Sequence, residues 1–183
     1  MMRNKRTVLR RFVFGIMAVM LVLTMLPVAV PKDHAVYAAS ARIGETKAEE
    51  IALKNAGAKS KDVAGLTCKL DREDNEYEVK FRKSGYSYEY TICAKSGRIE
   101  EKEYKIVRID KKSGNTTIGK NKAKNIAYKN AGVKSARGLN VRKQNYRGTK
   151  VWKVTFKKGK YEYEYKINIY SGRILAMEYE LDD

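Results

Sequence analysis

Tyr86-Ser-Tyr-Glu-Tyr-Thr-Ile-Cys-Ala-Lys-Ser-Gly-Arg-Ile99 is the stretch of this chain that decides the fold. Aromatic and β-branched residues alternate with polar ones, and Ser96-Gly97 then interrupts the run. This alternation predicts a strand with one apolar face, a tight turn, and a second strand that begins at Ile99.

The same pattern returns 75 positions later as Tyr161-Glu-Tyr-Glu-Tyr-Lys-Ile-Asn-Ile-Tyr-Ser-Gly-Arg-Ile174. Similarity at a constant offset indicates a duplicated structural unit. We therefore divide the chain into a first repeat over residues 43–109, a linker over 110–117 and a second repeat over 118–183.

Each repeat is expected to begin with one short helix. In the first repeat, apolar residues recur at helical spacing over 46–56. Thr46-Lys-Ala-Glu49 is typical of a capping box at a helix start, and Asn55-Ala-Gly57 is typical of a helix stop. Asn121 and Asn130-Ala-Gly132 take the same places in the second repeat.

Alternating strands follow the helix, over 63–70, 77–82 and 86–93, and Ile99 to Ile109 would add a fourth, frayed one. We expect an α+β fold of two tandem two-layer units, each with one helix packed on a three- to four-stranded antiparallel sheet. The tyrosines that alternate along each third strand are interpreted as core under the helix; a ligand-stacking platform is the alternative.

Residues 1–38 are interpreted as a secretory signal peptide. Met1 to Arg11 holds five cations and no acid, Phe12 to Val30 is almost entirely apolar, and small residues suit cleavage after Ala38 or Ala41. An uncleaved N-terminal membrane anchor is the alternative, because the apolar run could nearly span a bilayer. Cleavage would remove His34, the only histidine, and with it His-based catalysis and most zinc sites.

Three patterns together resemble the PepSY domain: Ala-x-x-Ile-Ala-x-x-Asn-Ala-Gly, then Tyr-x-Val-x-Phe, then Tyr-x-Tyr-x-Ile-x-x-x-Ser-Gly-Arg-Ile. The resemblance covers both repeats. It implies a secreted, non-catalytic binding module without a cofactor, which restrains a secreted or cell-surface peptidase. PepSY domains resemble the regulatory part of the propeptides of thermolysin-like metallopeptidases.

One position departs from the family, whose members usually have Asp after the third-strand Ile. Here Cys93 and Asn168 stand at that position. An Asn side chain can accept hydrogen bonds from the turn backbone, and we expect Asn168 to do so. We expect no such contact from Cys93.

Charge is distributed unevenly between the repeats. The chain holds 39 Lys+Arg and 21 Asp+Glu; residues 43–109 hold 14 cations and 13 acids, whereas 118–183 hold 16 and 6. We interpret this excess first as a solubilising surface; the alternative is an anionic partner, such as a cell-envelope polymer, an acidic lipid or the acidic face of an enzyme. The candidate residues are Lys122, Lys124, Lys129, Arg142, Lys143, Lys153, Lys157, Lys158 and Lys160. Nucleic acid would suit the same charge, but export makes it an unexpected physiological partner.

The remaining polar groups indicate structure rather than catalysis or metal binding. Carboxylates and lysines on the polar side of neighbouring strands are expected to form cross-strand pairs, not a catalytic pair: Glu78, Lys80 and Glu89 in the first repeat, and Lys153, Glu162, Glu164 and Lys166 in the second. The acidic run Asp71, Glu73, Asp74 and Glu76 is interpreted as a turn, since it lacks the spacing of a calcium loop.

Cys68 and Cys93 could form a disulfide, because export permits one. Strand parity places them on opposite faces of the sheet, which favours two separate thiols instead. No catalytic, metal-ligating or cofactor-binding residue is predicted. The function that we expect is capture of a peptidase or one of its peptide segments, for which an unpaired sheet edge is one possible mode.

Overall fold

The computed structural model describes residues 41–109 and 116–182, so the predicted signal peptide lies outside the described residues. No helix within the described ranges has the length and apolarity that a membrane span requires. The elements, in chain order, are α1 (Glu45–Asn55), a short 3-10 turn (Ser60–Asp62), β1 (Ala64–Asp71), β2 (Glu76–Lys83), β3 (Tyr86–Cys93), β4 (Ile99–Ile106), α2 (Lys120–Ala131), β5 (Arg137–Tyr146), β6 (Thr149–Lys158), β7 (Tyr161–Asn168) and β8 (Ile174–Leu181).

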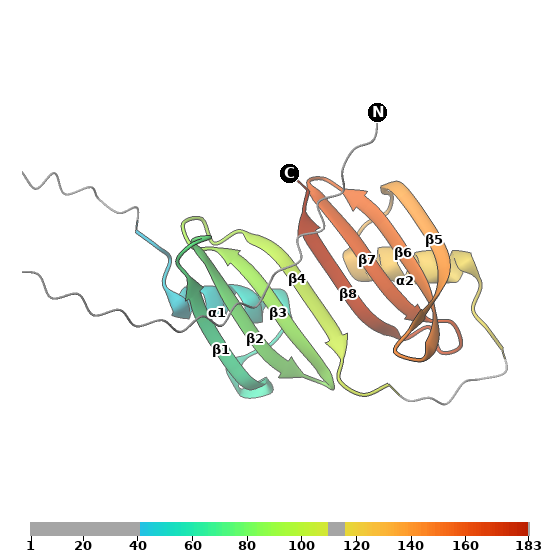
Figure 1. Cartoon of the computed structure of the whole chain (residues 1–183), viewed down its shortest axis with the longest axis horizontal. Helices are drawn as coiled ribbons and strands as arrows, with labels where there is room; N and C mark the ends of the chain where they lie inside the picture. The colour runs from blue at the N-terminus through green and yellow to red at the C-terminus, as the bar shows by residue number, and fades with distance from the viewer. Residues whose placement is uncertain (1–40, 110–115, 183) are drawn as a thin grey trace, which may run out of the picture. The chain divides into compact units, whose positions relative to one another are not determined.

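All eight strands form one antiparallel sheet, in the order β1-β2-β3-β4-β8-β7-β6-β5 (Figure 1). The repeats join at its centre, where β4 pairs with β8 over Glu101–Lys105 and Ala176–Glu180. The expectation of two tandem two-layer units, each with its own sheet, is therefore wrong. The physical reason is that β4 is not frayed: it pairs with β3 on one side and with β8 on the other, so neither repeat leaves that strand edge open.

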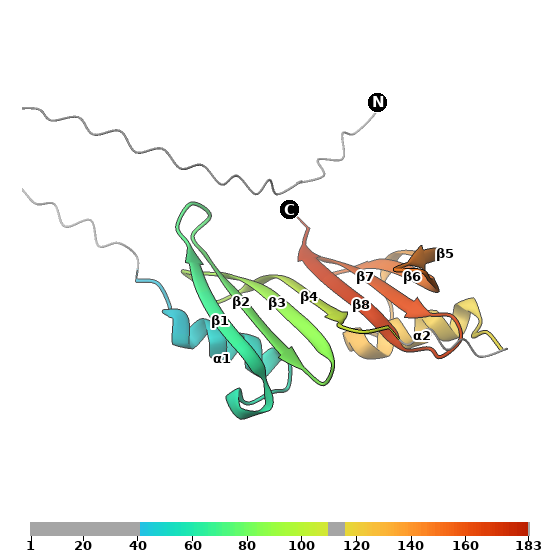
Figure 2. The ribbon, with the colours of Figure 1, turned by 60° about the horizontal axis from the view of Figure 1, so that its bottom comes forward.

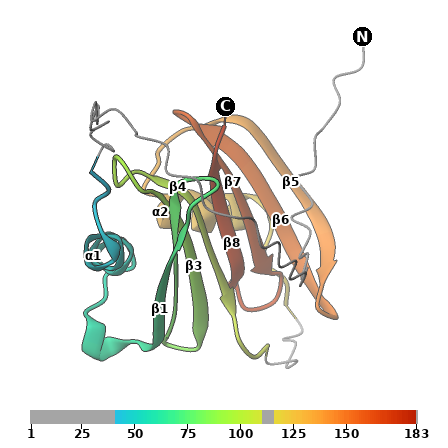
Figure 3. The same cartoon turned by 60° about the vertical axis from the view of Figure 1, so that its left-hand side comes forward.

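Both helices pack on the same face of this sheet. α1 packs on β1 and β2, and α2 packs on β5 and β6; Figures 1 and 2 show α1 against β1–β3, and Figure 3 shows it nearly end-on beside β1. Directly opposite side chains in a sheet share a face. The pairs Tyr90–Lys102, Lys102–Tyr179 and Tyr179–Tyr163 connect the residues under α1 to those under α2.

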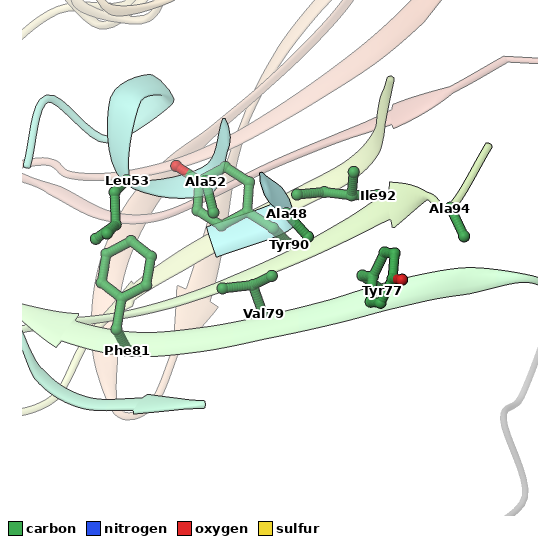
Figure 4. Close-up of a cluster of buried hydrophobic side chains, with 9 residues drawn as sticks. All are labelled: Ala48, Ala52, Leu53, Tyr77, Val79, Phe81, Tyr90, Ile92 and Ala94. Atoms are coloured by element: carbon green, nitrogen blue, oxygen red, sulfur yellow. The ribbon is translucent and has the colours of Figure 1, made fainter. Parts of the chain in front are cut away.

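Small residues bring each helix close to the strands. Ala48 and Ala52 of α1 are fully buried over a cluster from β2 and β3 (Figure 4), and Ala123 and Ala127 of α2 repeat this arrangement over β6 and β7. An alanine stripe permits close approach of large side chains on the sheet. The strand residues beneath the helices are Val79, Phe81, Tyr90 and Ile92 in the first repeat, and Val154, Phe156, Tyr165 and Ile167 in the second.

The predicted helix starts are wrong and the predicted stops are right. Gly44 and Gly119 are the N-cap residues, and neither helix start has a side-chain capping hydrogen bond. The helices begin before Thr46 and Asn121, which places these residues in the first turn, where they cannot cap. At the other end, Gly132 adopts the left-handed conformation, φ 68°, that ends α2 as expected.

The Ser-Gly turn after each third strand packs against the helix of the same repeat. Gly97 has φ +71°, and a Cβ there would lie 2.9 Å from Cδ1 of Ile51. Gly172 has φ +73°, and its Cβ would lie 3.2 Å from Cδ1 of Ile126. The glycine thus serves both the turn and the close contact with the helix, which explains its place in the repeated stretch.

The residue after the third-strand Ile holds this turn in both repeats. Asn168 Oδ1 accepts hydrogen bonds from the backbone N–H groups of Tyr170 (2.8 Å) and Ser171 (3.0 Å), as expected. At the equivalent place in the first repeat, hydrogen bonds from the side chain and then the backbone of Ser96 lower the pKa of the Cys93 thiol.

Candidate functional site

The nine basic residues predicted as an anion-binding face lie on both sides of the sheet. We call the face without helices the open face. On the helix side are Lys122, Lys124 and Lys129 on α2, with Lys143 and Lys158 on strands. On the open face are Arg142, Lys153 and Lys157, while Lys160 lies in the β6–β7 turn. Binding of an anion by these residues stays a prediction.

Ion pairs occupy part of the open face, as the strand pattern predicts. Lys80 Nζ lies 2.8 Å from Glu78 and 3.3 Å from Glu89. In the second repeat, Glu164 contacts both Lys153 and Lys166, the latter at 2.7 Å. Lys157 pairs with Asp182 at 2.5 Å and with Glu162 at 3.5 Å. These contacts partly neutralise Lys153 and Lys157 of the predicted cationic set.

Four glutamates lie at directly opposite positions across the four central strands of the open face: Glu89, Glu103, Glu178 and Glu164. Burial, and then the charges of Glu101, Glu103 and Glu164, raise the pKa of the Glu178 carboxyl. Like charges at facing positions destabilise a sheet. Within 41–109 and 116–182, no group of three or more Asp, Glu, His or Cys side chains is arranged to hold a metal ion.

The other candidates in the first repeat have local roles. In the acidic turn, Asp71 Oδ1 accepts hydrogen bonds from the backbone N–H groups of Glu73 (2.9 Å) and Asp74 (3.3 Å). Cys68 and Cys93 are free thiols. Cys68 packs among the apolar residues near α1, where burial and then Glu49 and Glu45 raise the pKa of its thiol to about 11.

The outermost strand of the second repeat, β5, is an edge of the described sheet. Ten residues long, it is exposed along most of its length, with Val141 as its one buried residue. A bulge between Arg137 and Asn140 interrupts its pairing with β6, and the register is regular from there to Tyr146. An exposed edge presents backbone N–H and C=O groups that can pair with another chain.

A groove of about 760 Å³ lies on the helix side of the sheet, between the ends of α1 and α2. Side chains of β4 and β8 form its floor, among them Lys102, Tyr104, Met177 and Tyr179. The groove exists because the two helices pack toward opposite ends of the sheet and leave the central strands uncovered.

The tyrosine ladders therefore divide into two groups. Tyr90 and Tyr165 are fully buried beneath the helices, which confirms the interpretation as core. Tyr88 and Tyr163 are half-buried: each packs against the core beside it and also lines the groove. Their rings stack on the buried phenylalanines Phe81 and Phe156, each with ring centroids 5.0 Å apart, so the wall of the groove is fixed by the core behind it.

Two equivalent asparagines hold the groove together from the helix ends. Asn130 Oδ1 accepts hydrogen bonds from the hydroxyls of Tyr104 (3.0 Å) and Tyr165 (3.1 Å). Asn55 Oδ1 accepts from the hydroxyl of Tyr90 (3.2 Å) and is also hydrogen-bonded to Tyr179. Each asparagine thus joins the helix of one repeat to a strand of the other.

Lys102 breaks this symmetry, because Met177 is its counterpart 75 residues later. Its ammonium donates a hydrogen bond to Asn55 Oδ1 (2.7 Å) and lies 5.4 Å from the centre of the Tyr90 ring and 5.9 Å from that of Tyr104. Burial alone lowers the pKa of Lys102 to about 8. Among the side chains that line the groove, all of them described, Lys102 carries the only charge.

Reasoning from the sequence missed Lys102, Asn55 and Asn130. Two signals could have found them. Lys102 alternates with Tyr104 and Ile106, so it stands at a position where the strand pattern calls for an apolar residue. The asparagines recur at the 75-residue offset, but the Asn-Ala-Gly pattern is already explained by helix termination.

Comparison with known proteins gives one relative with a significant sequence match. An uncharacterized protein of Streptococcus pyogenes serotype M6, Spy1430, is 41% identical over 63 residues, which are 33% of this chain and 48% of that protein. This chain therefore spans about half the length of that relative.

Solved structures resemble the chain only weakly. A BLIP-like protein from Bacteroides fragilis is 11% identical with a TM-score of 0.29, over 77% of this chain and 89% of that one. A DUF2874 family protein from Bacteroides uniformis is 14% identical with a TM-score of 0.26, over 70% of this chain and 86% of that one.

Among protein families, the match falls on the second repeat: residues 117–178 match the model of the peptidase propeptide and YPEB domain, PepSY.

Proposed function

We propose that this chain is an exported, non-catalytic binding module that restrains a peptidase by pairing an extended segment of it with β5. The first repeat, residues 43–109, is proposed to be a second copy of the PepSY domain matched at 117–178. In support, the two repeats share the helix alanines, the third-strand tyrosines and the Ser-Gly turn at one constant offset.

The observation that carries this proposal is the exposed edge of β5. The strand belongs to the part of the chain that matches a family of peptidase propeptides. Adding a strand to an exposed sheet edge is a common way to bind extended peptide, because main-chain hydrogen bonds supply affinity and side chains supply selectivity. β5 carries three basic side chains, Arg137, Arg142 and Lys143, and no acidic one, which favours an acidic segment.

Backbone amide exchange tests the mode directly. We expect the purified protein to slow peptide hydrolysis by a thermolysin-class metallopeptidase, and a catalytically inactive form of that peptidase to slow exchange of the β5 amides. The edge strand β1 is the internal control, because it occupies the equivalent place at the other end of the sheet. Equal protection of the β5 and β1 amides would contradict the proposal. So would the absence of any protection together with an unchanged rate of peptide hydrolysis.

A second candidate function is binding of a cell-envelope polyanion through the second repeat. It is favoured by one observation, the absence of Asp and Glu between Lys111 and Tyr161 in a stretch with 16 Lys and Arg. Binding of this kind weakens steeply with salt, whereas strand pairing with a peptidase should survive moderate salt. Affinity for poly-glutamate measured from 50 to about 500 mM salt separates the two functions.

A further inference from the structure

We infer that the groove between α1 and α2 is a binding site for a small carboxylate ligand with an aromatic or aliphatic body, such as the C-terminal end of a short peptide, and that Lys102 recognises the carboxylate. This site is separate from the proposed function, since no residue of β5 lines the groove.

The positive charge of Lys102 in the groove favours a negatively charged ligand. The Lys102 side chain is half-buried, its ammonium donates an exposed hydrogen bond to Asn55, and no carboxylate of the described residues forms an ion pair with it. A buried charge without an opposite charge is costly and is retained chiefly where it has a use. At neutral pH a lysine with a pKa near 8 is still mostly protonated, so the groove presents a cation to an incoming anion.

The repeat symmetry provides an internal comparison. At the position equivalent to Lys102 the second repeat has Met177, which is 4% exposed and fills the same kind of space with apolar atoms. An apolar side chain therefore suits this position, and the fold does not require the lysine. The charge is an addition to one half of an otherwise symmetric floor.

The walls of the groove select the rest of the ligand. Its volume of about 760 Å³ lies in the usual range of sites for small organic ligands. The half-buried rings of Tyr88 and Tyr163 line the groove and offer apolar contacts to the body of the ligand. The pKa of each is raised by burial, so their hydroxyls remain protonated donors. A phosphate would favour an arginine cluster with bidentate geometry, and no arginine lines this groove.

The test compares two probes that differ only in charge: N-acetyl-phenylalanyl-phenylalanine and the same dipeptide with a C-terminal amide. We expect calorimetry at pH 7 to give at least tenfold tighter binding of the acid. In NMR titrations the acid should shift the resonances of Lys102 and of the Asn55 side-chain amide. Equal affinity of acid and amide, or no binding of either at millimolar concentration, would overturn the inference.

Two variants locate the charge. Lys102→Met copies the residue at the equivalent position and should remove the preference for the acid. Lys105→Met is the matched control: it removes one positive charge from the same strand, but on the open face, where Lys105 pairs with Glu103 at 2.7 Å. Loss of the preference in the control, or its persistence in Lys102→Met, would show that Lys102 does not recognise the carboxylate.

Three further measurements test the folding of the variant, the class of the ligand and the location of the site. Thermal unfolding of Lys102→Met should show a folded protein at least as stable as the parent, so that lost binding is not lost folding. Inorganic phosphate that displaces the acid more strongly than acetate does would overturn the assignment to a carboxylate. NMR shift changes confined to β5 would place binding at the edge strand and would overturn the assignment of the site to the groove.

Discussion

Glu103 of β4 lies directly opposite Glu178 of β8, and these residues occupy the same position in the two repeats, 75 residues apart. Because the strands are antiparallel, each pair on one side of this point has an equivalent on the other. Lys102 faces Tyr179, and Tyr104 faces Met177. The centre of the sheet therefore has a local pseudo-two-fold axis, and differences between equivalent residues become informative.

The first prediction concerns the glutamates at this axis. The pKa of Glu178 is raised in the folded chain, so the folded state binds protons over a pH range in which the unfolded state has lost them. Stability from this group is therefore lost as pH rises through that range. Glu178→Gln should raise the free energy of unfolding at pH 7 by about 0.5–1 kcal/mol in urea denaturation.

The control for this charge effect is Glu50→Gln. Glu50 forms an exposed ion pair with Lys47 at 3.0 Å, and a pair of this kind contributes little. The stabilisation by Glu178→Gln should shrink toward acid pH, whereas a gain of equal size at pH 4 and pH 7 would argue against relief of charge repulsion.

The second prediction concerns the link between repeats at Asn130. Asn130→Ala leaves the buried hydroxyls of Tyr104 and Tyr165 without their acceptor. We expect a loss of about 1–3 kcal/mol in the free energy of unfolding, because unsatisfied buried donors are costly. Asn125→Ala, on the exposed side of the same helix, should change stability by no more than about 0.5 kcal/mol. Equal losses in the two variants would show that the tyrosine contact does not set the effect, since Ala is a better helix former than Asn.

The third prediction uses the pKa of Lys102, lowered by burial from 10.5 to about 8. Between these values Lys102 binds its proton more tightly in the unfolded state than in the folded state, so its contribution makes the free energy of unfolding rise with pH above about 8. Tyr90, Tyr104 and Tyr179 surround the ammonium, and burial raises the pKa of all three, to about 12 for Tyr179, so they stay neutral in the folded state. In the unfolded state tyrosines ionise near pH 10, which lowers the free energy of unfolding there, so the Lys102 effect is measured between about pH 8 and 9.

Lys102→Met should accordingly stabilise the protein by about 1–3 kcal/mol at pH 7 and flatten the rise between about pH 8 and 9. Denaturant unfolding at several pH values measures both effects. A variant less stable than the parent at pH 7 would indicate that the hydrogen bond to Asn55 outweighs the cost of burying the charge.

The fourth prediction concerns two reciprocal hydrogen bonds across the repeats. The Tyr86 hydroxyl donates to the carbonyl of Ile174, and the Tyr161 hydroxyl donates to that of Ile99, both at 3.0 Å. Among the described residues, only Tyr86 of these two also accepts a hydrogen bond, from Nε of Arg173 at 3.1 Å. Tyr86→Phe should therefore lose about 1–2 kcal/mol and Tyr161→Phe about 0.5–1 kcal/mol in thermal unfolding. A reversed order would contradict this account.

The elements within each repeat were predictable because they depend on local patterns. Alternation along 77–82 and 86–93 agrees with β2 and β3, and the Asn-Ala-Gly stops agree with the ends of both helices. The starts of the helices could not be predicted in this way, because the N-cap residues Gly44 and Gly119 precede the residues that resemble caps in the sequence. Backbone conformation alone begins these helices, and no side-chain pattern records it.

The joining of the repeats could not be predicted from the pattern of β4. Its residues Glu101, Glu103 and Lys105 alternate with Lys102, a charge at an apolar position, so the segment looks like a frayed edge. What pairs it with β8 is contact at a distance in sequence: backbone hydrogen bonds along the strand and the hydroxyls of Tyr86 and Tyr161. For the same reason the groove, which needs both repeats, was not foreseen.

The pairing of β4 with β8 has a consequence for any protein built from one such repeat. That protein would present the β4 edge to solvent, and two copies joined in the register seen here would form an exact homodimer, with one glutamate facing its own symmetry mate. Fusing the copies into one polypeptide frees each half to diverge. Lys102 opposite an apolar counterpart is such a divergence, and no symmetric homodimer could carry it on one side alone.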